Sequence, residues 1–334
     1  MPLDPQFQAV RDARAAEGTP PLYTLTLEQA RAADLADIRA GAGGGQRVHE
    51  VTEEHVPGPG GTLTVRVHRP DATPGRPVLL YFYGGGWTLG SLDTCDAVCR
   101  FLANAAGCVT VSAGYRLAPE HPFPAAVEDC WAALCWTAAN AQRFGGDPTR
   151  IAVAGDSAGG NLAAVTAQTA RDRGGPALAH QVLVYPNTDY RPPPERPHAA
   201  AAADPYLFNE RSVDWYWSHY LARREDGADP RASPLRARDL TGLAPATVVT
   251  AEYDPLCAEG QAYAARLREA GVPVELRRWD GMAHGFFTMT GVLPQAREAQ
   301  EFVAARLRAA LAGPAVARSA HSRTSADSRT EARP

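Results

Sequence analysis

The amino-acid sequence predicts an α/β fold with a mostly parallel central sheet flanked by helices. Two observations support this prediction. Short apolar runs of strand length alternate with longer stretches of helical periodicity along most of the chain. Two of the apolar runs lead directly into glycine-rich turns, at residues 84–86 and 155–159. Repeated strand–helix units of this kind pack as a parallel sheet that helices cover on both faces.

The strands are expected from about residue 47 onward. Leu63, Val65 and Val67 alternate with polar residues, which is typical of a half-buried edge strand. The run 78–83 is apolar throughout, as expected of a central strand that is buried on both faces. Runs of the same kind predict strands at residues 108–113, 151–154, 181–185, 247–250 and, as a weaker signal, 274–279.

Helices are expected between these strands, and one is expected before them. Thr26 and Gln29 have the spacing of a capping box at the start of an N-terminal helix. The glycine-rich run 41–45 then predicts a hinge or linker. The aromatic-rich stretch 212–222 predicts a further helix that interrupts the regular alternation. The remaining helices are expected at residues 123–141, 158–171, 258–270 and 295–311.

The chain is therefore divided into three parts. Residues 1–45 form an N-terminal helical segment of the kind that can cap a domain, and residues 46–312 form the α/β domain. An insertion at about 187–225 separates two strands, and it is interpreted either as a lid or as a surface excursion. Residues 313–334 lack large apolar side chains and predict a disordered tail.

Charge and composition exclude several classes of function. The formal net charge of −4 argues against a nucleic-acid-binding protein, which would carry a basic excess. No apolar run approaches the roughly 20 residues that a membrane-spanning helix needs. Asp4, Arg11 and Asp12 interrupt the region where a signal peptide is apolar, so a cytoplasmic protein is expected. The six cysteines form no C-x-x-C pair, so no structural metal site is expected.

The strongest chemical signal is the sequence Gly155-Asp156-Ser157-Ala158-Gly159. It follows an apolar strand and opens a helix, which is the context of a nucleophile elbow. In such a turn the serine is held out at the end of the sheet, and the flanking glycines allow strand and helix to approach closely. Ser157 is therefore the candidate nucleophile.

A serine needs a base, and the base needs an acid that orients it. His284 lies on a loop just beyond a predicted strand, and His121 is the alternative base. Asp254 follows the strand at 247–250 and is favoured as the acid, with Asp280 as the alternative. The order Ser157, Asp254, His284 along the chain is the order that α/β-hydrolases use.

The glycine run after the strand at 78–83 suggests an oxyanion hole. Gly84, Gly85 and Gly86 lack side chains, so their backbone amides can approach a substrate closely. The amide of Ala158, at the start of the nucleophile helix, offers a further donor.

These motifs together resemble the bacterial hormone-sensitive-lipase-like carboxylesterases, a family with the α/β-hydrolase fold. The resemblance extends over about residues 75–290 and includes the blocks 115–125, 155–161, 254–256 and 284–286. It implies a triad of Ser157, Asp254 and His284. It also implies oxyanion donors from Gly85, Gly86 and Ala158, and a helical cap formed by the N-terminal segment and the insertion. Members of the family hydrolyse short- to medium-chain esters without a cofactor or metal.

The sequence departs from the family pattern at three positions. Tyr83 replaces the histidine that usually braces the glycine turn, Gly114 replaces a common aspartate, and Ala258 replaces a second acid, although Glu259 is adjacent. We expect Tyr83, Gly84 and Glu120 to support the turn. A turn displaced by Tyr83 would lower activity on simple esters, and Tyr83→His would then raise it.

The sequence therefore predicts a serine carboxylesterase that acts on a small-molecule ester through an acyl-enzyme. A metabolite deacylase, an acyltransferase or a cyclase with the same triad is the alternative, followed by a non-catalytic ligand receptor. Trp87, Asp156, Trp215 and Phe286 are candidates to line the substrate pocket. A homodimer is compatible with the resemblance.

Overall fold

The computed structural model describes residues 2–190 and 203–312, and its fold is built on one β-sheet. Its eight strands lie in the order β1-β2-β4-β3-β5-β6-β7-β8. The pairs β1–β2 and β2–β4 are antiparallel, and all other neighbours are parallel, which confirms the predicted sheet. The strands are β1 (Glu50–Gly58), β2 (Gly61–Arg69), β3 (Arg76–Phe82), β4 (Val109–Ala113), β5 (Gly146–Asp156), β6 (Leu178–Val184), β7 (Ala246–Tyr253) and β8 (Val274–Ala283).

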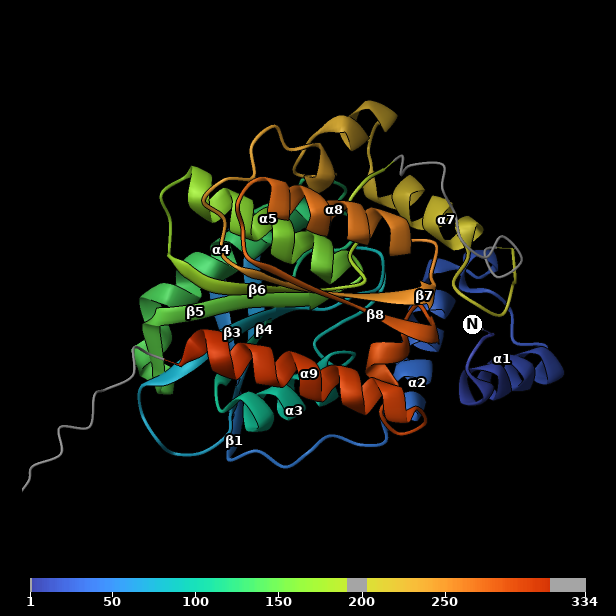
Figure 1. Ribbon diagram of the computed structural model, residues 1–334, viewed down its shortest axis with the longest axis horizontal. Helices are drawn as coiled ribbons and strands as arrows, with labels where there is room; N and C mark the ends of the chain where they lie inside the picture. The colour runs from blue at the N-terminus through green and yellow to red at the C-terminus, as the bar shows by residue number, and fades with distance from the viewer. Residues whose placement is uncertain (1, 191–202, 313–334) are drawn as a thin grey trace, which may run out of the picture.

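Helices cover both faces of the sheet (Figure 1). Helices α4, α5 and α8 lie on one face, and α3 and α9 lie on the other. Strand β3 between them has no exposed side chain at Val78, Leu79 or Leu80, as its uninterrupted apolar run predicts. These five helices are α3 (Asp96–Ala106), α4 (Ala125–Asn140), α5 (Ala158–Asp172), α8 (Cys257–Glu269) and α9 (Pro294–Leu311).

Helix α3 is the main element that the sequence analysis missed. Its buried residues Val98, Cys99, Leu102 and Ala106 recur at helical spacing on one face. Gly107 follows with a φ of 66°, which is the usual left-handed end of a helix. The periodicity of an amphipathic helix was therefore present in the sequence. The prediction did not include it, because the helix is short and lies close to the glycine turn.

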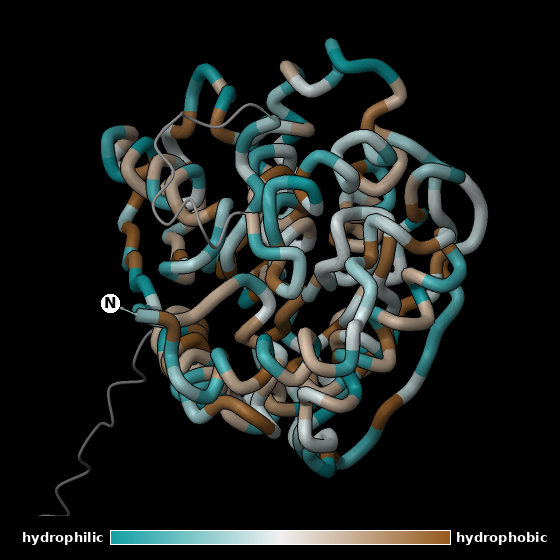
Figure 2. The backbone as a smooth tube through the Cα atoms, turned by 90° about the vertical axis from the view of Figure 1, so that its right-hand side faces the viewer, coloured by the Kyte–Doolittle hydropathy of each residue, from teal (hydrophilic) through white to brown (hydrophobic). Residues whose placement is uncertain are grey.

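Three helices gather at the carboxyl edge of the sheet (Figure 1). They are α1 (Pro5–Glu17), α2 (Leu27–Ala42) and α7 (Glu210–Tyr220). Figure 2 looks onto this side, where the outer turns at the top and bottom of the view are hydrophilic. The predicted capping box of α2 is confirmed, because Thr26 and Gln29 exchange side-chain and backbone hydrogen bonds. Short 3-10 helices connect the larger elements at Leu22–Thr24, Ala141–Phe144, Arg224–Ala228, Pro234–Arg236 and Phe286–Thr288.

The N-terminal segment is tied to the rest of the molecule by ion pairs. Arg31 of α2 binds both carboxylate oxygens of Glu120 at 2.8 Å. Arg11 of α1 pairs with Asp204 at 2.9 Å, in the part of the insertion that follows residue 202. The helices at the carboxyl edge therefore contact both the α/β domain and the insertion.

The glycine run at 41–45, predicted as a hinge or linker, begins within helix α2 and continues into the segment that connects α2 to β1. Helix α2 continues to Ala42 and ends at Gly43, which has a φ of 68°. The Gly291 amide donates to the Gly41 carbonyl at 2.8 Å, and a Cβ at Gly43 would lie 2.6 Å from the Gly291 Cα. Glycines are needed here because two backbones pack against each other.

Two further expectations from the sequence concern the C-terminal tail and membrane-spanning helices. The predicted tail, residues 313–334, lies outside the described residues. Among the helices of the described ranges, none combines the length and apolarity needed to span a bilayer.

Candidate active site

Ser157 occupies a strained turn between β5 and α5. Its φ is +55° and its ψ −122°, a conformation that costs a non-glycine residue about 1–3 kcal/mol. The turn is possible because Gly155 and Gly159 lack side chains. A Cβ at Gly159 would overlap the carbonyl of Phe82, and one at Gly155 would overlap Gly159 itself. The Ser157 amide donates to the Val184 carbonyl at 2.8 Å, which fixes the turn against β6.

His284 connects Ser157 to Asp254 by two short contacts. Its Nε2 lies 2.9 Å from Ser157 Oγ, and its Nδ1 lies 2.7 Å from Asp254 Oδ2. The other Asp254 oxygen accepts the Leu256 amide at 2.8 Å, so this carboxylate is oriented from both sides. The imidazole stacks on the ring of Phe208, with 4.0 Å between the ring centres. The structure therefore brings together three residues that are up to 127 positions apart.

The alternative base and acid lie elsewhere. Asp280 is exposed and pairs with Arg278 at 2.6 Å. His121 is exposed on the loop that precedes α4. Neither residue contacts Ser157 or His284, so the geometry favours Asp254 and His284.

The glycine turn after β3 faces the same cavity as Ser157. Gly84 donates its amide to Asp156 Oδ1 at 3.2 Å, and the Tyr81 hydroxyl donates to the same oxygen at 2.8 Å. Burial raises the pKa of the Asp156 carboxyl, and these two hydrogen bonds act in the opposite direction. Asp156, in the nucleophile turn, therefore positions the glycine turn.

Three backbone amides near Ser157 remain available. Within the described residues, no acceptor takes the amides of Gly85, Gly86 or Ala158. The first two belong to residues with φ values of +102° and +59°, and Ala158 begins helix α5. Free amides at a helix N-terminus and a glycine turn form a site that stabilises negative charge.

Tyr83 is braced by Tyr115 in place of the usual histidine contact. The Tyr115 hydroxyl donates to the Tyr83 carbonyl at 2.8 Å, and the two rings stack with their centres 4.4 Å apart. The Tyr83 hydroxyl reaches the Tyr115 carbonyl at 3.4 Å. Glu120 does not touch the glycine turn. It holds Arg31, whose Nε donates to the Thr88 carbonyl at 3.0 Å, so its support is indirect.

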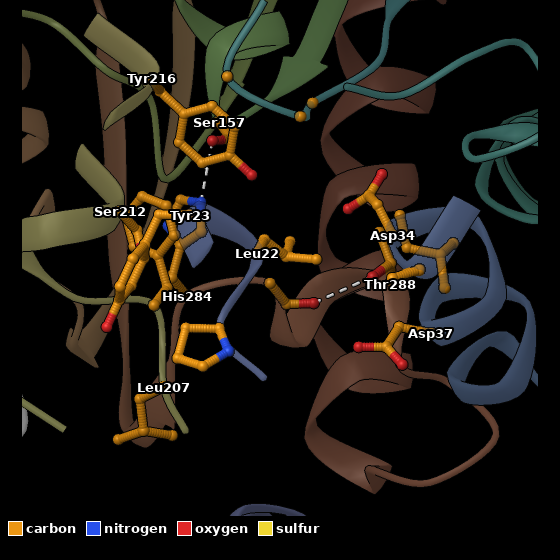
Figure 3. A pocket seen from close by; sticks show the side chains of 18 of the residues that line it. Leu22, Tyr23, Asp34, Asp37, Ser157, Leu207, Ser212, Tyr216, His284 and Thr288 are labelled. Atoms are coloured by element: carbon orange, nitrogen blue, oxygen red, sulfur yellow. Dashed lines mark hydrogen bonds between the residues drawn. The ribbon is translucent and has the colours of Figure 1, made fainter. Parts of the chain in front are cut away.

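A cavity of about 260 Å³ opens beside Ser157 and His284 (Figure 3). Of the four residues predicted to line it, Asp156 and Trp215 do so. Trp87 and Phe286 do not. Trp87 is fully buried and stacks on Tyr220 with ring centres 4.1 Å apart, and Phe286 is also fully buried. Both side chains belong to the core, because each packs against other buried aromatic rings, Trp87 against Tyr220 and Phe286 against Tyr185.

Most residues of the cavity wall were not predicted from the sequence. The N-terminal segment contributes side chains on one side, and residues 205–216 contribute on another. Helix α2 was predicted, but which of its residues face the site depends on how it docks. The missed lining residues include Leu22, Tyr23, Asp34, Asp37, Ile38, Tyr185, Leu207, Phe208, Ser212, Thr288 and Met289.

Metal-ligating groups are not clustered in the described part of the chain. No group of three or more His, Cys, Asp or Glu side chains in residues 2–190 and 203–312 has the arrangement of a metal site. The cysteines are unpaired, and all but the half-buried Cys135 are buried. Burial raises the pKa of the Cys108 thiol to about 12, as expected of an inert core residue.

Comparison with known proteins gives consistent matches. A family model described as alpha/beta hydrolase fold matches residues 79–288. The chain is 43% identical over 296 residues to "Carboxylic ester hydrolase LipN" of Mycobacterium tuberculosis, which covers 86% of this chain and 77% of that protein. It is 36% identical over 307 residues to "Ethyl acetate hydrolase" of Pseudomonas putida, covering 89% of this chain and 96% of that one.

A solved structure is similar over nearly the whole chain. A hyperthermophilic esterase from the archaeon Pyrobaculum calidifontis superposes with a TM-score of 0.88 at 40% sequence identity. The match covers 92% of this chain and 99% of the esterase. This chain and the esterase are therefore similar both in sequence and in the arrangement of their helices and strands.

Proposed function

The chain belongs to the hormone-sensitive-lipase-like family of α/β hydrolases, and on that premise we propose that it hydrolyses carboxylic esters through an acyl-serine intermediate. One observation carries the proposal: the continuous Ser157–His284–Asp254 contact chain opens onto a cavity that is also lined by Gly85 and Gly86 of the glycine turn. The relatives named above are an esterase and two ester hydrolases.

Acylation begins at Ser157. As its Oγ attacks the ester carbonyl, its proton passes to His284 Nε2, which already lies 2.9 Å away. Asp254 accepts a hydrogen bond from the Nδ1–H of His284 and balances the charge of the imidazolium. His284 then donates the proton to the leaving alcohol, and the acyl group stays on Ser157.

The developing oxyanion is stabilised by the amides of Gly85, Gly86 and Ala158. These donors need no reorganisation, because the turn is already held by Asp156 and by the Tyr83–Tyr115 pair. Water then attacks the acyl group with His284 as the base, and the same steps run in reverse to release the acid.

The cavity sets the substrate class. A space of about 260 Å³ accommodates a short- to medium-chain acyl group, and the aromatic side chains of Tyr23, Phe208, Trp215 and Tyr216 offer it an apolar surface. No residue of the proposed mechanism requires a cofactor.

The test is hydrolysis of p-nitrophenyl esters of increasing acyl length by the wild type and by Ser157→Ala. We expect turnover that peaks at short or medium chains and is lost in Ser157→Ala. Ser218→Ala is the matched control, because this exposed serine on α7 bonds only to the Trp215 carbonyl of its own helix. It should keep wild-type activity.

A fluorophosphonate probe separates the two ways in which the assay can fail. Labelling of the wild type but not of Ser157→Ala, without ester turnover, would replace ester hydrolysis by acyl transfer to another acceptor. Absence of both turnover and labelling would refute a catalytic role.

A further inference from the structure

Helix α2 places two carboxyl groups in the wall of the cavity opposite the nucleophile. Figure 3 shows Asp34 and Asp37 on this helix, pointing into the space whose other side holds Ser157 and His284. Neither carboxyl takes part in the proposed mechanism. A polar group at this place can contact the part of a substrate that does not react.

The two carboxyl groups differ in their partners. Asp37 pairs with Arg14 of α1 at 3.2 Å. Asp34 is half-buried and has no hydrogen-bond or ion-pair partner among the described residues, and its Oδ2 has no access to bulk solvent. Asp156, the third carboxyl of the cavity wall, accepts hydrogen bonds from Tyr81 and Gly84. Asp34 is therefore the carboxyl of the cavity wall that lacks a partner.

The lack of a partner for Asp34 destabilises the folded protein. A carboxylate without a partner is destabilised when it leaves water. Burial, followed by the charges of Asp37 and Asp156, raises the pKa of Asp34 to about 7. Among the described residues that line the cavity, Arg14 is the one arginine and is already paired, and the sequence contains no lysine. The described part of the cavity wall therefore offers Asp34 no unpaired arginine or lysine.

We propose that Asp34 is a substrate-binding residue that receives a protonated amine carried by the ester. The proposal rests on the function proposed above and narrows its substrate class to amino esters. A cation bound at Asp34 gives this half-buried carboxylate a charge-assisted hydrogen bond. The aromatic rings of Tyr23, Phe208, Trp215 and Tyr216 in the same cavity suit the carbon chain that links the amine to the ester, and they tolerate a cation.

The test uses pairs of esters that differ only in charge. One pair carries a dimethylaminopropyl alcohol part or the isostere in which CH replaces NH⁺, and a second pair carries the same groups in the acyl part. The quantity measured is the ratio of kcat/KM for the cationic ester to that for the neutral ester. His284 acts equally on both members of a pair, so its ionisation cancels in the ratio.

We expect the wild type to prefer the cationic member of at least one pair. Asp34→Asn keeps the shape but removes the charge, and the ratio should fall by about tenfold or more. Glu28→Gln removes an exposed carboxyl of the same helix that does not line the cavity, and it should change the ratio by less than about twofold. Equal ratios in the wild type and Asp34→Asn, or a wild-type preference for both neutral members, would overturn the proposal.

A binding measurement separates this proposal from the proposed function. Calorimetric titration of Ser157→Ala with the intact esters needs no turnover. Tighter binding of a cationic ester that is lost in Ser157→Ala/Asp34→Asn supports the subsite even if the wild type hydrolyses neither ester. Equal binding of both members refutes the subsite, while hydrolysis of the neutral esters by the wild type would leave the proposed function intact.

Discussion

Replacing Asp34 by Asn should stabilise the protein, and the gain should grow with pH. The carboxyl is unpartnered, and burial together with the charges of Asp37 and Asp156 raises its pKa from an ordinary 3.8 to about 7. Between these two values the folded chain holds a proton that the unfolded chain has released. The free energy of unfolding therefore falls as the pH rises from about 3.8 to about 7, and it changes little above that range, where the folded chain has also lost the proton.

The magnitude follows from the two pKa values. A difference of one in pKa corresponds to about 1.4 kcal/mol, so the full cost of ionised Asp34 is about 4 kcal/mol as an upper limit. At about pH 8.5 nearly all of this cost is present, whereas at about pH 5.5 it is about 2 kcal/mol. The stability difference between Asp34→Asn and the wild type should thus grow by about 2 kcal/mol between these conditions.

Urea unfolding followed by tryptophan fluorescence measures this difference at each pH. The other ionisable groups among the described residues of the cavity wall, which are Arg14, Asp37, Asp156 and His284 together with Tyr and Cys side chains, are present in both proteins and cancel in the comparison. Glu28→Gln is the control, because Glu28 is an exposed carboxyl of the same helix that does not line the cavity. A stability difference between Asp34→Asn and the wild type that is the same at both pH values would refute the reasoning.

Three further predictions concern the reaction and the turn that supports it. Asp254→Asn should lower kcat by about 10⁴, because the amide no longer fixes the His284 tautomer; a decrease below about tenfold with an unchanged circular dichroism spectrum would contradict the assigned role. Tyr115→Phe should lower kcat by about tenfold at nearly constant KM, since the hydrogen bond to the Tyr83 carbonyl is lost and the oxyanion donors shift; wild-type kcat on p-nitrophenyl esters would show that ring stacking alone suffices. Gly159→Ala should cost about 3 kcal/mol or more, because the new Cβ overlaps the Phe82 carbonyl, and thermal unfolding within a degree of the wild type would contradict the packing argument.

The nucleophile turn was readable from the sequence because its determinants are local. A strand, a turn with glycines two residues before and two after the serine, and a helix follow one another within residues 146–172. The steric need for Gly155 and Gly159 arises from backbone that lies at most a few residues or one neighbouring strand away. The same locality explains why the capping box of α2 and the central strands were predicted correctly.

The tertiary structure shows where the two candidate acids lie. Asp254 follows β7 and reaches His284, whereas Asp280 lies within β8 and pairs with Arg278. The brace between Tyr83 and Tyr115 likewise joins residues 32 positions apart. Such pairs depend on how strands and loops pack, and the spacing of residues along the chain does not specify that.

The sequence by itself determined the fold class, the order of its elements and the local turns that carry the chemistry, because hydrophobic periodicity and glycine placement act over short distances. Only the tertiary structure decided the walls of the cavity. In the folded chain, the side chains of Trp87 and Phe286 are buried in the core, and Asp34 lines the same cavity as Ser157. The rotation of a helix and the direction of a loop side chain are set by the surface on which they dock. That surface is built from residues that lie far away in the sequence.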